Sequence, residues 1–131
     1  MQTSRHPDLE IYLKNSTNSQ ILAWLQTHCS TVLVLRETPS SLELELQFEA
    51  GLVQASLQHK VSGKAWSSLW FKDNQTPWDT DLDCALIASQ QLQTQIRCTK
   101  ASWEDDGIDR EEEDQWWKIE DGERVLISWK G

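Results

Sequence analysis

Hydrophobic and polar residues alternate along several short stretches of this chain. The clearest stretch runs from Leu42 to Glu49, where four apolar residues alternate strictly with four polar ones. A similar alternation occurs at 9–14 and resumes at 53–58. Because successive side chains of a strand point to opposite faces, each stretch predicts a β-strand with one buried face and one face toward solvent.

Two other stretches repeat apolar residues at helical spacing. After several N-cap candidates at 15–18, Ile21 and Trp24 begin a pattern that predicts a short amphipathic helix with Trp24 in the core. A second pattern covers 82–92 and follows Thr80, with acidic residues in the first turn where the helix dipole favours them. We therefore predict a second helix that begins just after Thr80.

Two strands have apolar residues at neighbouring positions rather than at alternating ones. The unbroken run Val32 to Leu35 is typical of a strand covered on both faces, so we expect 31–37 to lie centrally in the sheet. The stretch 65–72 places Trp66 and Trp70 on one face and other apolar residues on the opposite face. Such a strand is either sandwiched between layers or partly exposed at a binding surface.

Turn-forming pairs separate these strands. Reversals are expected at Ala50-Gly51, Ser62-Gly63 and Asp121-Gly122. The first hairpin is expected to place Phe48 opposite Val53, with both side chains facing inward.

The order of these elements predicts the fold class. It reads β-α-β-β-β-β-α-β-β-β, which favours an α+β domain built on a single-layer, mostly antiparallel sheet of about seven or eight strands. Two helices should pack on one face of that sheet. No repeat or Pro- or Gly-rich linker divides the chain, so we expect one domain over 1–131, with a flexible N-terminus at 1–8 and an acidic loop at 104–114.

Charge is concentrated in one segment. The chain carries a net charge of -9, and the segment 104–114 contains eight acids and one base, a net of -7. Subtracting it leaves 13 acids and 11 bases elsewhere, or -2. The twelve Lys and Arg residues are dispersed, which disfavours direct nucleic-acid binding because phosphates demand clustered cations.

The cysteines and the absence of long apolar stretches indicate the compartment. Cys29, Cys84 and Cys98 form an odd, widely spaced set, which favours reduced and buried thiols over a disulfide framework. The first residues contain no apolar signal core, and no stretch approaches the ~18 apolar residues of a membrane span. We therefore expect a cytoplasmic protein without a membrane partner.

No chemical motif fits its template, so the sequence assigns no metal, cofactor or catalytic residue. Asp79, Asp81 and Asp83 alternate as in a calcium loop, yet the required Gly and the final Glu are replaced by Cys84 and Gln90. The acidic segment fails the same template when it is started at Ser102. Neither a zinc-type ligand spacing nor a nucleophile elbow occurs, and whether the protein is an enzyme is left open, with the balance toward no.

The acidic segment and its flanking tryptophans are the leading candidate for a function. The plainer interpretation is a solvated loop between two strands. The functional one is a docking site for a basic protein, because concentrated carboxylates steer association and Trp is common at interface hot spots. In size and charge only, the chain is similar to bacterial immunity proteins that block nuclease toxins. The candidate partner-binding residues are Trp103, Glu104, Asp105, Asp106, Asp109, Glu111, Glu112, Glu113, Asp114, Trp116 and Trp117.

Two other hypotheses compete with docking. A small-molecule binder or an enzyme could use a surface formed by Trp66, Trp70, Asp73, Trp78 and Asp79. A homodimer could close an open sheet edge or cover an exposed Trp face. Adjacent Trp116 and Trp117 must point to opposite faces of their strand, and the sequence does not decide whether they are core or interface.

Overall fold

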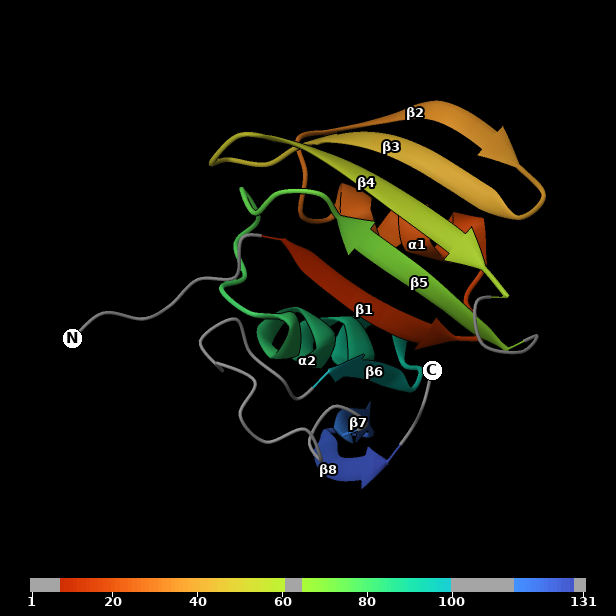
Figure 1. Ribbon diagram of the computed structural model, residues 1–131. Helices are drawn as coiled ribbons and strands as arrows, with labels where there is room; N and C mark the ends of the chain where they lie inside the picture. Colours follow the sequence, from red (N-terminus) through yellow and green to blue (C-terminus); the bar gives the residue numbers. More distant parts are fainter. Residues whose placement is uncertain (1–7, 61–64, 100–114, 129–131) are drawn as a thin grey trace.

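The structure, a computed structural model, describes residues 8–60, 65–99 and 115–128. These residues form one antiparallel eight-stranded sheet and two helices, which confirms the predicted α+β class and element order (Figure 1). The elements are β1 (Leu9–Lys14), α1 (Asn18–Gln26), β2 (Thr31–Thr38), β3 (Ser41–Gln47), β4 (Leu52–His59), β5 (Trp66–Phe71), α2 (Asp81–Leu92), β6 (Ile96–Thr99), β7 (Gln115–Glu120) and β8 (Glu123–Ser128).

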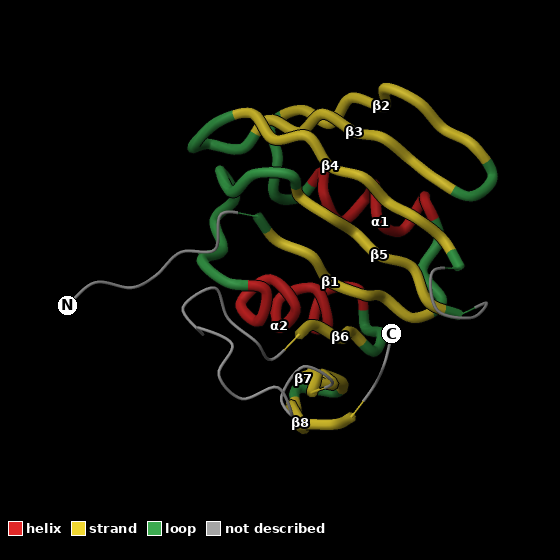
Figure 2. The backbone as a smooth tube through the Cα atoms, viewed as in Figure 1, coloured by secondary structure: helices red, strands yellow, loops and turns green. Residues whose placement is uncertain are grey.

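The strand order places the first strand in the interior of the sheet. It runs β2-β3-β4-β5-β1-β6-β7-β8, so β1 lies between β5 and β6 (Figure 2). Leu9 pairs with Phe71 of β5, and Tyr12 pairs with Arg97 of β6. β1 therefore joins the β2–β5 meander to the three C-terminal strands.

Local capping explains where the two helices begin. At α1, the Thr17 hydroxyl accepts a hydrogen bond from Gln20 N–H, and the Gln20 side chain accepts one from Thr17 N–H, at 3.2 and 2.9 Å. This reciprocal pair is a capping box. At α2, the Thr80 hydroxyl accepts a hydrogen bond from Asp83 N–H at 3.1 Å, which confirms the predicted start.

The core lies between the helices and one face of the sheet. Figure 1 shows α1 behind β4 and β5. Buried side chains of both helices belong to the same core cluster as the inward side chains of the strands, so the helices lie on one face of the sheet and leave its other face uncovered by helix. Burying one Val, Leu or Ile side chain stabilises the fold by roughly 1.5–3 kcal/mol. Strand side chains with a relative exposure of 1% or less in this core are Leu9, Ile11, Leu13, Leu42, Leu44, Leu46, Val53, Ala55, Leu57, Leu69, Phe71, Ile96, Cys98 and Ile119. From the helices, Trp24 joins them as predicted, at 4% exposure.

The prediction that 31–37 lies centrally in the sheet is wrong. β2 is the first strand in the order, and Leu33 and Leu35 are 49% and 51% exposed. An apolar run shows only that both faces of a strand tolerate burial. In the described part of the chain, the helices cover one face of the sheet and no second layer covers the other. Its edge position follows from β1, which inserts between β5 and β6 instead of beside β2.

The predicted register of the first hairpin is also wrong, by two residues. Val53 pairs with Leu46 instead of Phe48, because Phe48 and Gly51 exchange two backbone hydrogen bonds of 2.9 and 3.2 Å. Only Glu49 and Ala50 then lie in the turn. A shift of two keeps every side chain on its face, so the inward positions were predicted correctly.

The structure describes one of the two other predicted reversals. The predicted reversal at Asp121-Gly122 joins β7 to β8, while the one at Ser62-Gly63 lies outside the described residues. Within residues 8–60, 65–99 and 115–128, neither helix is long and apolar enough to cross a membrane.

Candidate functional site

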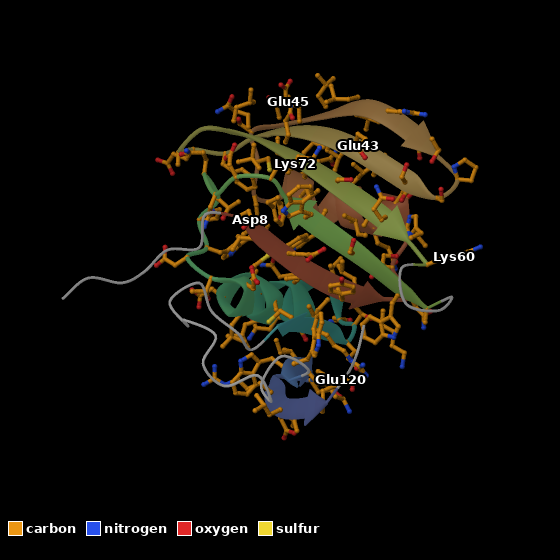
Figure 3. All side chains as sticks on the ribbon, in the orientation of Figure 1. Asp8, Glu43, Glu45, Lys60, Lys72 and Glu120 are labelled. Carbon is orange, nitrogen blue, oxygen red and sulfur yellow. The ribbon has the colours of Figure 1, made fainter. Side chains whose placement is uncertain are left out.

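The uncovered face of the sheet carries the best candidate site, because it combines a half-exposed tryptophan with several carboxylates. The pairing registers align Glu10 of β1, Trp70 of β5, Ser56 of β4 and Glu43 of β3 in one row across four strands. Strand alternation points all four side chains to the side away from the helices. In Figure 3, Glu43, Glu45 and Lys72 lie over this part of the sheet.

Trp70 is at the centre of this row. Its side chain is 38% exposed, and its indole Nε1–H donates a hydrogen bond to Asp8 Oδ2 at 2.7 Å. Lys72 Nζ lies 5.5 Å from the ring centroid, within the range of a cation–π contact. One edge of the indole is thus fixed by a carboxylate, while its face already attracts a cation.

Glu43 is tied into the same surface by a chain of side-chain contacts. Ser56 Oγ donates to Glu43 Oε2 at 2.8 Å, and Gln58 Nε2 donates to Ser56 Oγ at 3.0 Å. Lys72 Nζ lies 3.8 Å from Glu43 Oε1, with the two side chains 39% and 31% exposed. An ion pair with this exposure contributes ~0–1 kcal/mol, so Lys72 can exchange partners at little cost.

Glu10 adds a second carboxylate next to Trp70. Burial raises the pKa of Glu10, and the nearby charges of Asp81 and Asp8 raise it further. Asp81 Oδ1 also accepts a hydrogen bond from Glu10 N–H at 3.1 Å, which holds the carboxylates near one another. A cation placed here would relieve their mutual repulsion. We call the set Asp8, Glu10, Glu43, Glu45, Trp70 and Lys72 the carboxylate–Trp70 surface.

The same face carries a second aromatic cluster, whose tryptophan rings are largely covered by neighbouring side chains. Arg97 Cζ lies 4.5 Å from the Trp66 centroid, and Tyr12 meets Trp116 edge to face at 5.1 Å and 89°. Burial lowers the pKa of Arg97, although Glu120 acts in the opposite direction. Trp66 and Trp116 are only 9% and 8% exposed. Both rings therefore serve packing.

The predicted small-molecule set is divided between the two sides of the sheet. Trp66 and Trp70 lie on the uncovered face, whereas Trp78 is 6% exposed in the core cluster and stacks on Trp24 at 5.6 Å and 11°. Asp73 and Asp79 lie in the connection between β5 and α2. Trp66 and Trp70 thus share a face but lie four residues apart in β5 with different neighbours, and Trp78 lies on the opposite side of the sheet.

Two hollows near the helices lie apart from that set. One of about 550 Å³ is lined by Trp24, Gln91 and neighbouring residues of α1 and α2. Another of about 270 Å³ lies beside His28, Phe48 and Gln75. None of Trp66, Trp70, Asp73, Trp78 and Asp79 lines either hollow.

Most of the predicted partner-binding set lies outside the described residues. This holds for Trp103 and for all eight acids of 104–114. Trp116 and Trp117 are described, and they point to opposite faces as predicted. Trp117 packs against the core on the helix side, with Arg124 Cζ 5.4 Å from its ring.

The described residues also bear on possible chemistry. In residues 8–60, 65–99 and 115–128, no group of three or more His, Cys, Asp and Glu side chains could hold a metal ion. Burial raises the pKa of Cys29 to about 11, and it raises the pKa of Cys84 and Cys98 well above the usual thiol value. These thiols stay protonated near neutral pH, which makes them poor nucleophiles.

No family model, curated protein or solved structure matches this chain. The candidate site therefore rests on its own geometry. Sequence reasoning did not single out Asp8, Glu10, Glu43 or Glu45. Strand alternation did place the last three toward solvent, but only the strand order shows that Glu10 and Glu43 flank Trp70.

Proposed function

We propose that this protein is a non-enzymatic protein-interaction module that binds a basic partner on the carboxylate–Trp70 surface. The observation that carries the proposal is the position of half-exposed Trp70 between Glu10 and Glu43 in one cross-strand row. Four carboxylates and one ammonium give this surface a formal net charge of -3. An Arg or Lys side chain of the partner would meet both an aromatic face and carboxylate oxygens there.

Lys72 supports this chemistry because it already makes both contacts. Its ammonium lies over the Trp70 ring and beside Glu43. A guanidinium is a better ligand for such a pair, since it stacks on the ring and binds a carboxylate with two hydrogen bonds. The partner's Arg would take the position of Lys72, whose long side chain can move into solvent.

The acidic segment belongs to the same proposal through its charge. By sequence it connects β6 to β7 and carries eight acids. Its charge would raise the rate at which a basic partner arrives, while the carboxylate–Trp70 surface would supply the defined contacts.

The test is a titration with an oligoarginine peptide, followed through the indole N–H resonance of Trp70 and assigned with Trp70→Phe. We expect the double variant Glu43→Gln/Glu45→Gln to weaken binding by roughly tenfold, equivalent to about 1.4 kcal/mol. The matched control Glu49→Gln/Asp83→Asn removes the same charge from exposed positions off this face and should change affinity by less than about twofold.

A third variant locates the binding contacts. Replacing the eight acids of 104–114 by Ser or Asn should slow association and leave the Trp70 shift intact at saturation. Equal losses in the two double variants would contradict the proposed surface. The same is true if neutralising 104–114 abolishes the Trp70 shift.

A further inference from the structure

β2 exposes an apolar strand at one end of the sheet. Among the described residues it pairs only with β3, over Thr31–Thr38. Leu33, Val34 and Leu35 are 49%, 40% and 51% exposed. The edge of β2 that points away from β3 therefore presents apolar side chains together with the backbone N–H and C=O groups of an edge strand.

The backbone of β2 specifies what can cover it. An edge strand offers a row of N–H and C=O groups at the spacing of a β-ladder, which only an extended chain can match. The occupant is therefore another strand rather than a helix face. The side-chain pattern of β2 determines which strand can pair with it.

A bulge makes that pattern symmetric. Val34 pairs with Leu44 and Arg36 pairs with Glu43, so Leu35 is an extra residue that resets the alternation. Before it, Thr31 and Leu33 face the uncovered side. After it, Arg36 and Thr38 do so, because they pair with Glu43 and Ser41. Read from either end of the strand, the first and third side chains therefore face the uncovered side and the second faces the helices.

We propose that β2 pairs antiparallel with β2 of a second copy of this chain, about a two-fold axis between Val34 and Leu35. Residues directly opposite each other in a ladder point to the same face. Among the residues whose faces are fixed by pairing with β3, only the register that sets Thr31 opposite Thr38 satisfies this throughout, and it also sets Leu33 opposite Arg36. A strand without the bulge would place these pairs on opposite faces.

The charges of β2 allow two copies to meet. Arg36 and Glu37 cancel, so the strand is neutral although the chain carries -9. In the proposed register the methylene stem of each Arg36 covers Leu33 of the second copy and keeps its guanidinium in solvent. The pairing is isologous, so it closes as a dimer and does not grow into a filament.

The first experiment measures mass by sedimentation over a wide range of concentration. The full chain should change from 15.2 kDa toward twice that value as concentration rises. Leu35→Lys should raise the dimer dissociation constant about a hundredfold, because it replaces two apolar side chains next to the two-fold axis by two ammonium groups of like charge. Leu52→Lys and Val125→Lys are matched controls at 50% and 51% exposure and should leave it unchanged.

The second experiment reads the register. An oxidised mixture of the Leu33→Cys and Arg36→Cys variants should form a mixed disulfide, because directly opposite Cα atoms lie about 4.5–5.5 Å apart. A mixture of Leu33→Cys with Thr38→Cys should not. A chain that stays monomeric at every concentration overturns the proposal. Higher polymers that Val125→Lys abolishes also overturn it, since they would show pairing of β2 with β8.

Discussion

Glu10 lies beyond the part of β1 that pairs with β6 in the described chain. That pairing covers Tyr12 and Leu13, and the Glu10 N–H donates a hydrogen bond to the Asp81 carboxylate. That arrangement places a second negative charge near the Glu10 side chain. Together with burial and Asp8 it raises the pKa of Glu10.

The raised pKa of Glu10 sets the sign of a pH effect. A carboxyl whose pKa is higher in the folded state favours folding when protonated, and this stability is lost as pH rises through the folded pKa. We expect Glu10→Gln to increase the free energy of unfolding at pH 7 by about 0.5 kcal/mol, a small value because the group is partly exposed. Near pH 3 the variant and the native protein should be equally stable.

Urea unfolding at the two pH values measures this difference. Glu123→Gln removes the same charge from an exposed position in β8 and serves as the control. A Glu10→Gln protein that is less stable than the native one at pH 7 would contradict the proposed repulsion.

For these residues the sequence predicted which face of the sheet each side chain occupies, but not which side chains it contacts. Alternation correctly placed Trp66 and Trp70 together on one face and Glu10 and Glu43 toward solvent. The hydrogen bond from Trp70 to Asp8 could not be predicted, because it depends on β1 lying beside β5.

The β7–β8 hairpin depends on backbone geometry at its turn. Asp121 and Gly122 have φ values of 55° and 80°, which is the left-handed region. Both residues favour such a turn, and Gly does so without strain. A Cβ added at Gly122 would meet no atom within 4 Å, so any cost of a substitution arises from the backbone alone.

We therefore expect Gly122→Ala to lower the free energy of unfolding by about 1 kcal/mol. Gly122→Asn should lower it less, because Asn enters the left-handed region more readily than Ala does. Thermal or urea unfolding of both variants provides the test. Equal losses for Ala and Asn would show that the turn is not the cause.

The sequence predicted which segments form helices and strands more reliably than it predicted which strands lie next to each other. Helix caps are local, so a few residues suffice to predict that α2 begins after Thr80 and to restrict the cap of α1 to the candidates at 15–18, of which Thr17 is the one used. The edge position of β2 is not local. Its run from Val32 to Leu35 would suit a central strand equally well, and only the insertion of β1 elsewhere decides the matter.

For the whole molecule, the cysteines report on global unfolding. Cys84 and Cys98 are fully buried in the core, and burial raises their pKa. We expect neither thiol to react with a disulfide reagent at pH 8 except through unfolding, so both should react at one common rate. Cys29, at 9% exposure, should react independently and slowly, since its pKa is raised to about 11.

Single Cys→Ser variants assign each phase of the reaction. In denaturant all three thiols should react rapidly. If Cys84 and Cys98 reacted at different rates under native conditions, α2 would be opening separately from the sheet.

The carboxylate–Trp70 surface is assembled from distant parts of the chain. Its carboxylates come from β1, β3 and the residue before β1, which are distant in sequence. Their proximity follows from the strand order, and the sequence predicted the fold class without that order. The acidic segment was conspicuous because its charges are contiguous, whereas the charges around Trp70 are not.

The interior position of β1 also constrains how the chain can assemble during translation. Both neighbours of β1 are synthesised after it, β5 at Trp66–Phe71 and β6 at Ile96–Thr99. The β2, β3 and β4 strands can pair as each leaves the ribosome, but β1 has no neighbour until β5 is made and no second neighbour until β6 is made. Its apolar face is thus exposed longest in the nascent protein, and the sheet is joined into one unit only when translation has passed β6.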